Sequence, residues 1–358
     1  MPLSSSSSWI FVCFSFASFF LFFYLLSSFL SLLLAFFFFF FFFFFFFSFF
    51  FFFFFFFVSS SSSWSSSAHL ISQNPGLVVA GGRAWGQNRA NVSFGHGDWM
   101  NGVTWLDMPG LRVPRESPAL AVAGQADLAA LGGHLSNGSK TAAVERFDGV
   151  AWADGPSLPV AVSHAAAVGL ADGRVVALGG FGASLDGIAG VFVLDLSSTS
   201  ATWSSATPLQ QARGAHCAAV VPGLGIVVVG GAANVDGPLL NTVEVLDAHT
   251  LQPMASTSVA ALPADIELPA CAVLGDTLIV TSAGAGVYKL VASCAGNLDW
   301  TLFAPTATRK TPLLGLHVLY GAIFAVHNDG AYQFRGSRSW LKCSTTTAQL
   351  GALAGAGQ

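Results

Sequence analysis

Short apolar runs alternate with turn-forming residues along most of the chain, from residue 77 onward. Runs of four to six apolar residues bounded by glycine, proline or serine are typical of β-strands. Four of these runs end in a glycine pair, at Gly81–Gly82, Gly132–Gly133, Gly179–Gly180 and Gly230–Gly231. The first glycines of the pairs are 51, 47 and 51 residues apart, and two less regular copies follow at Thr281 and His327. A spacing near 50 residues predicts a repeat architecture.

Other features keep the same spacing as the glycine pairs. A second run ends in an aspartate in three copies, and a tryptophan follows in most copies, at Trp105, Trp152, Trp203, Trp300 and Trp340. A turn with proline and a strand of small apolar residues come next, so each copy carries about four short strands. Such a sheet cannot bury both faces alone, and neighbouring sheets must therefore stack around an axis.

The repeats thus predict an all-β, six-bladed propeller over residues 77–358, with five or seven blades as the alternatives. The first copy begins at its Gly–Gly strand, and residues 347–353 read as the strand that normally precedes such a strand. We therefore expect the C-terminal strand to complete the first blade as its innermost strand. Closure of this kind removes a free sheet edge.

These repeats resemble the kelch family, whose repeat combines a strand ending in Gly–Gly, a strand ending near Asp, a spaced Trp and a strand that starts with Arg or His. The resemblance covers about 280 residues and is strongest in the second, third and fourth copies. It implies a propeller whose loops bind other proteins. In this family, arginines placed like Arg115 and Arg213 point toward the central channel and bind acidic partners.

The region before the repeats has a different character. Residues 1–67 consist mainly of Phe, Ser and Leu, and residues 68–76 read as a linker. The apolar span 9–58 exceeds the roughly 20 residues that a bilayer helix needs. One interpretation is a membrane anchor, which places the protein at a membrane. The other is a translated polypyrimidine tract that does not belong to the protein, which then is cytoplasmic.

Charge and cysteine content narrow the chemistry. No Asp, Glu, Lys or Arg precedes Arg83, so the net charge of −4 belongs to the repeat region alone. This mildly acidic balance does not favour nucleic acid as a partner. The five cysteines form no CxxC pair, which gives no zinc or redox motif. The four in the repeat region, Cys217, Cys271, Cys294 and Cys343, read as small core residues; a disulfide requires a secreted domain, and the sequence alone cannot pair them.

Four residues are candidates for binding a partner: Arg115, Arg213, His164 and His216. The two histidines read as equivalent positions of successive repeats, which favours a structural role over metal binding. Some kelch propellers are copper oxidases or sialic acid mutarotases, but the Tyr/Cys/His cluster of the oxidases is missing. No cofactor is therefore expected.

The sequence favours a monomeric, non-catalytic scaffold that binds another protein through propeller loops. A carbohydrate-binding or mutarotase-like enzyme, with its site in the channel at Arg115, Glu116, Arg213 and Glu267, is the alternative.

Overall fold

The chain divides into two units, Met1–Ser63 and Trp64–Gln358. The computed structural model describes only residues of the second unit: 77–81, 83–84, 87–88, 90–98, 102–123, 127–196, 201–254, 259–263, 266, 268–282, 286–292, 297–304, 313–319, 321–327, 330–334 and 340–342. Every regular element among these residues is a β-strand. This confirms the predicted all-β class.

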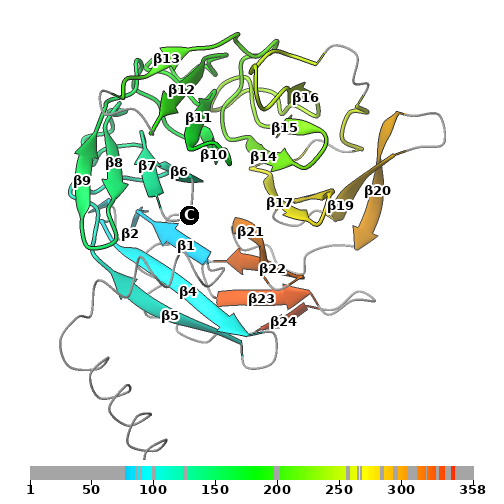
Figure 1. Cartoon of the computed structure of the whole chain (residues 1–358), viewed down its shortest axis with the longest axis horizontal. Helices are drawn as coiled ribbons and strands as arrows, with labels where there is room; N and C mark the ends of the chain where they lie inside the picture. The colour runs from blue at the N-terminus through cyan, green and yellow to red at the C-terminus, as the bar shows by residue number, and fades with distance from the viewer. Residues whose placement is uncertain are drawn as a thin grey trace, which may run out of the picture. The chain divides into compact units, whose positions relative to one another are not determined.

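The strands form successive antiparallel sheets that surround a common centre (Figure 1). Blade 1 contains β1 (Leu77–Ala80), β4 (Val92–Asp98) and β5 (Gly102–Met108). Blade 2 contains β6 (Ala119–Ala123), β7 (Asp127–Leu131), β8 (Val144–Phe147) and β9 (Trp152–Gly155). Blade 3 contains β10 (Ala166–Gly169), β11 (Arg174–Leu178), β12 (Val191–Asp195) and β13 (Ser204–Ser205).

The later sheets follow the same order. Blade 4 contains β14 (Cys217–Val221), β15 (Gly225–Val229) and β16 (Val243–Leu246). Blade 5 contains β17 (Ala270–Leu274), β18 (Thr277–Thr281), β19 (Val287–Ala292) and β20 (Leu298–Ala304). Blade 6 contains β21 (Leu313–Leu319), β22 (Ala322–His327), β23 (Gly330–Phe334) and β24 (Trp340–Lys342). A small hairpin joins β2 (Arg83–Ala84) to β3 (Gln87–Asn88).

Blades 2 to 6 are the five blades that begin with an inner strand, and blade 1 is a partial sheet. The inner strands β6, β10, β14, β17 and β21 each pair with the strand that follows in the chain. Blade 1 instead begins with β1, its Gly–Gly strand, which pairs with β4. The prediction of six complete blades is thus corrected to five in the described part of the chain. The expected closing strand, 347–353, lies outside the described residues.

The core is divided among the spaces between successive blades. Each strand alternates its side chains between two faces, so each blade presents one apolar face to the blade before it and one to the blade after it. In β11, for example, Val175 and Ala177 pack toward blade 2, whereas Val176 and Leu178 pack toward blade 4. Five apolar clusters of this kind lie between successive blades, one at each interface from that of blades 1 and 2 to that of blades 5 and 6.

Glycine pairs are needed because the backbone of the next blade comes very close to them. Gly132, Gly133, Gly179 and Gly180 all have positive φ. A Cβ on Gly132 or Gly179 would lie 2.5 Å from a carbonyl oxygen of the following blade, that of Val162 or Arg213. The same carbonyls accept hydrogen bonds from the second glycines, at 2.7 Å from Gly133 and 2.8 Å from Gly180. The glycine pair therefore forms part of the joint between blades.

A residue in the left-handed region precedes the inner strand in blades 2 to 5. Ser117, His164, Ala215 and Leu268 stand two residues before these strands and have φ between 47° and 53°. This conformation costs about 1 kcal/mol or more for a residue with a Cβ. Backbone hydrogen bonds between blades offset that cost: His164 N donates to Ser117 O (3.2 Å), and Ala215 N donates to His164 O (2.9 Å).

The expectation of a membrane anchor falls on residues 9–58, which lie outside the described part of the chain. Within the described part, no helix has the length and the hydropathy needed to cross a bilayer.

Candidate binding surface

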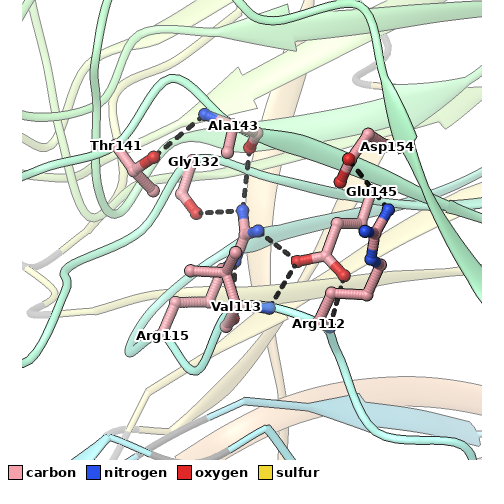
Figure 2. Close-up of polar contacts among 8 residues, drawn as sticks. All are labelled: Arg112, Val113, Arg115, Gly132, Thr141, Ala143, Glu145 and Asp154. Atoms are coloured by element: carbon pink, nitrogen blue, oxygen red, sulfur yellow. Dashed lines mark hydrogen bonds and ion pairs between the residues drawn. The ribbon is translucent and has the colours of Figure 1, made fainter.

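Arg115 lies inside blade 2, and its side chain is fully buried. Its guanidinium donates to the carbonyl oxygens of Val113 (3.2 Å), Gly132 (3.0 Å) and Ala143 (2.8 Å), and to the Glu145 carboxylate (Figure 2). Glu145 also accepts hydrogen bonds from the backbone N–H groups of residues 112 and 113, at 2.6 and 3.1 Å. Arg115 therefore ties the segment before β6 to the strands β7 and β8.

Arg213 repeats this arrangement in blade 4, also with no exposed side-chain surface. It donates to the carbonyl oxygens of Gln211 (3.3 Å), Gly230 (2.8 Å) and Thr242 (3.1 Å), to the Thr242 hydroxyl (3.0 Å) and to Glu244 (2.7 Å). All five guanidinium N–H groups are thereby used. Burial lowers the pKa of both arginines, and the neighbouring carboxylates Glu145 and Glu244 oppose that shift. Neither arginine presents its guanidinium to a partner in this structure.

The two glutamates that pair with these arginines were not identified from the sequence, although the sequence contained a pattern that could have revealed them. Glu145 and Glu244 occupy the same place in the strand after the Gly–Gly loop, because Glu145 pairs with Ala130 and Glu244 with Val228. At that place, Phe192 stands in blade 3 and Tyr288 in blade 5. The copies that carry Arg before the inner strand are thus the copies that carry Glu in this later strand.

His164 and His216 are not equivalent, contrary to the sequence-based interpretation. Ala166 pairs with Leu178 and Cys217 with Val229, which makes Ala166 and Cys217 equivalent. His164 precedes Ala166 by two residues, but His216 precedes Cys217 by one. The sequence-based alignment of the two histidines was wrong by one position. The segments before the inner strands have no alternation of apolar and polar residues that would fix their alignment between repeats.

His216 is buried beside the glycine pairs of two blades. A Cβ on Gly179 would lie 2.7 Å from its ring carbon Cε1, and one on Gly231 would lie 2.7 Å from its Cβ. Neither ring nitrogen has a hydrogen-bond partner in the structure. Burial, together with the nearby charge of Arg213, lowers the pKa of His216 to about 3. The imidazole is therefore neutral at physiological pH.

His164 belongs to a small polar cluster between blades 2 and 3. The buried Ser163 hydroxyl lies 3.2 Å from His134 Nε2 and 3.3 Å from His164 Nδ1. The His164 ring also lies near the rings of His134 and Phe181, with centroids 5.7 and 5.8 Å away. Burial, together with electrostatic interactions with His134 and Lys140, lowers the pKa of His164 to about 4. Ser163 is only 1 % exposed, so this serine is not accessible to a substrate as a nucleophile.

Three loops follow the glycine pairs of blades 2, 3 and 4. We call these the Gly–Gly loops: residues 134–140, 181–187 and 232–239. Lys140 Nζ donates to the Gly182 carbonyl, which connects the first loop to the second. The second and third loops are joined by backbone hydrogen bonds from Val235 N to Leu185 O (3.1 Å) and from Gly187 N to Ala233 O (2.8 Å). The loops therefore form one continuous surface on a rigid support.

The second and third Gly–Gly loops expose large apolar side chains. Leu185 is 49 % exposed, Val235 45 % and Leu239 36 %, and we call these three residues the loop patch. Leu185 also has φ of 70°, an uncommon conformation for a leucine. Asp186 and Asp236 lie beside the patch and are exposed. The loop patch combines apolar surface with negative charge on loops that are fixed across two blades.

The tryptophans contact the segment that leads out of the preceding blade. Trp152 Nε1 donates to Pro109 O (2.8 Å), Trp203 Nε1 to Pro156 O (2.7 Å) and Trp300 Nε1 to Ala260 O (2.9 Å). Their rings pack in the apolar clusters between blades. Trp105 and Trp340 lie in β5 and β24, and their side chains are outside the described part of the structure.

Two further observations bear on function. Among the described residues, no group of three or more His, Cys, Asp or Glu side chains is arranged to hold a metal ion. Comparison with models of known protein families finds no match, and comparison with curated proteins finds none either. The propeller fold therefore rests on the structure, and membership of the kelch family stays a resemblance.

Proposed function

We propose that this protein is a non-catalytic scaffold of the kelch type that binds another protein through its Gly–Gly loops. The observation that carries the proposal is the loop patch, where Leu185, Val235 and Leu239 are exposed on two loops joined by backbone hydrogen bonds. Loops held by a rigid scaffold are common sites of binding. Exposed apolar groups on a fixed surface lose little conformational freedom when a partner covers them.

The charges beside the patch define the partner further. Asp186 and Asp236 lie next to the exposed apolar residues. Complementary charge favours specific association and raises its rate. We therefore propose a partner segment that carries apolar side chains next to Lys or Arg. The proposed partner is a protein rather than a nucleic acid, because the loop patch combines exposed apolar groups with acidic ones.

A sugar site in the channel receives less support. That alternative placed its site at Arg115, Glu116, Arg213 and Glu267, and the side chains of both arginines are buried and bonded within their own blades. Closure of the propeller by residues 347–353 is part of the proposal, since a closed wheel holds the three loops in fixed positions.

The test compares two triple variants of the full-length protein as bait. The patch variant carries Leu185→Asn, Val235→Ser and Leu239→Ser; Asn is chosen because it tolerates positive φ. The matched control carries Val150→Ser, Val160→Ser and Leu302→Ser, which are exposed to a similar extent elsewhere. We expect a partner that binds the wild type and the control, and that binds the patch variant at least tenfold more weakly in calorimetry with purified proteins.

Equal binding of that partner to all three baits would show that the loop patch is not the binding surface. Turnover of a free sugar by the wild type, with no protein partner recovered, would overturn the scaffold function as a whole.

A further inference from the structure

Two cysteines face each other across the space between blades 4 and 5. In β14, Cys217, Ala219 and Val221 point toward blade 5, because side chains alternate along the strand. In β17, Cys271 and Val273 point back toward blade 4, whereas their neighbours pack toward blade 6. Cys217 and Cys271 thus belong to the same apolar cluster, although they are on different inner strands.

The interfaces of blades 2–3 and of blades 3–4 carry alanines at these two places. The strand pairing makes Cys217 equivalent to Ala166 and Ala119. It makes Cys271 equivalent to Ala218 and Ala167. The interface of blades 3 and 4 therefore has the alanines 166 and 218 in one cluster, and that of blades 2 and 3 has the alanines 119 and 167. Small residues at these places let the inner strands approach closely, and of these three interfaces only that of blades 4 and 5 carries two thiols there.

The two thiols also interact directly. Both cysteines are free in the structure, with Cys217 buried and Cys271 partly exposed. Burial raises the pKa of the Cys217 thiol well above its usual value, and the side-chain hydrogen bond to Cys271 raises it further. Cys271 is therefore the thiol that a reagent from solvent reaches first.

We propose that Cys217 and Cys271 form a disulfide that links the inner strands of blades 4 and 5 when a low-molecular-weight disulfide such as oxidised glutathione is present. The Cys271 thiolate attacks one sulfur of glutathione disulfide, which forms a mixed disulfide and releases one glutathione thiolate. The Cys217 thiolate then attacks the Cys271 sulfur and releases the second glutathione. Two protein thiols are oxidised, one glutathione disulfide is reduced to two thiols, and the two thiol protons pass to the released glutathione.

This linkage closes a loop of about 54 residues that contains β15, β16 and the third Gly–Gly loop. A cross-link of this kind stabilises a protein mainly by restricting its unfolded chain. It acts as a redox-dependent clamp on the blade that carries Val235 and Leu239. The proposal rests on the inner strands alone and does not depend on what the loop patch binds.

The experiment treats the full-length protein with oxidised glutathione, then blocks remaining thiols with N-ethylmaleimide under denaturing conditions. Trypsin leaves both cysteines in one peptide, because no Lys or Arg lies between Arg213 and Lys289. When a protease that cleaves after Glu is added to trypsin, it separates them at Glu244 and Glu267, and Cys217 then lies in peptide 214–244 and Cys271 in peptide 268–289. We expect mass spectrometry to find the two resulting peptides joined by a disulfide.

We also expect oxidation to raise the melting temperature by roughly 5 to 10 °C, reversibly with dithiothreitol. The matched controls are Cys217→Ala and Cys271→Ala, which install the residue found at both places in the interfaces of blades 2–3 and 3–4. Each should fold and lose the rise. Blocked thiols at both positions after oxidation, pairing with another cysteine instead, or a melting temperature that rises equally in Cys271→Ala would each overturn the proposal.

Discussion

At the scale of single residues, buried ionisable groups in this protein are held by the blades rather than offered to a ligand. Arg115 and Arg213 show this most clearly, since backbone carbonyls, one carboxylate each and, for Arg213, the Thr242 hydroxyl accept their hydrogen bonds. Among the residues that the structure describes, His216 is the exception, because it is buried with both ring nitrogens unpartnered. Its effect on stability must therefore depend on pH.

The pH prediction follows from the lowered pKa of His216. Its pKa is about 3 in the folded protein and about 6.5 when the chain unfolds. Between these values the unfolded state binds more protons, so the free energy of unfolding falls as the pH falls. This one group accounts for a loss of about 2 kcal/mol between pH 7 and pH 5. Urea unfolding at both pH values, on the wild type and on His216→Gln, measures it.

We expect His216→Gln to lose about 2 kcal/mol less than the wild type over that pH interval, whatever its stability at pH 7. The exposed His249→Gln serves as control and should keep the wild-type pH dependence. An unchanged pH dependence in His216→Gln would mean that the buried imidazole does not oppose protonation.

At the scale of the single blade, the same framework is stabilised in two chemically different ways. Blades 2 and 4 use the buried pairs Arg115–Glu145 and Arg213–Glu244. Blade 3 has Val162 and Phe192 at the equivalent places, and both are buried in one apolar cluster. A buried ion pair and a well-packed apolar pair can be similarly stable, but a single charge left without its partner is strongly destabilising.

The blade comparison predicts a non-additive mutant cycle in blade 4. Arg213→Val and Glu244→Phe, which install the residues of blade 3, should each lower the free energy of unfolding by about 3–5 kcal/mol. The double variant should be more stable than either single variant, because no unpaired charge remains. Chemical denaturation of the four proteins gives the coupling energy. Additive losses in the double variant would contradict the view that the two positions act as one unit.

At the scale of the whole molecule, the repeat spacing predicted the architecture because each blade is built from local, recurring strands. The glycine pairs lie where the next blade approaches most closely, and that steric need is visible in a single sequence. Pairing across blades was harder to predict. In the fifth copy, Thr281 pairs with Ala270 as Val229 pairs with Cys217, so Ser282 takes the place of Gly230. The sequence-based alignment, which used Thr281, was off by one residue.

The candidate site was less predictable than the fold. Arginine before an inner strand suggested a partner in the channel, yet its partner is a glutamate about 30 residues away in the same blade. The loop patch left no sequence signal, because isolated apolar residues in loops are common and their exposure depends on how two loops pair. The exposure and the contacts of the candidate site therefore depend on strand register and on neighbouring blades. The blades themselves depend on the local sequence pattern and could be predicted from it.

The remaining prediction concerns closure of the wheel. In the described residues, β1 pairs with β4 on one side only, which leaves the inner edge of blade 1 for the expected strand 347–353. If that strand pairs with β1, Leu350 and Leu353 become buried and contribute on the order of 3 kcal/mol. Deletion of residues 347–358 should then lower the melting temperature by roughly 5 °C or more and speed amide hydrogen exchange at Val78 and Val79.

Deletion of residues 354–358 alone is the matched control, because it removes only small or polar residues beyond the expected strand. It should leave both the melting temperature and the exchange of β1 unchanged. Slow exchange of β1 in the longer deletion would show that another segment protects this edge. If the longer deletion leaves the edge of β1 open, this edge can pair with a second molecule. We therefore also expect the longer deletion to associate in a concentration-dependent way. If these results are obtained, pairing of strand 347–353 with β1 holds the inner strands in place. It also fixes the positions of the three Gly–Gly loops relative to one another.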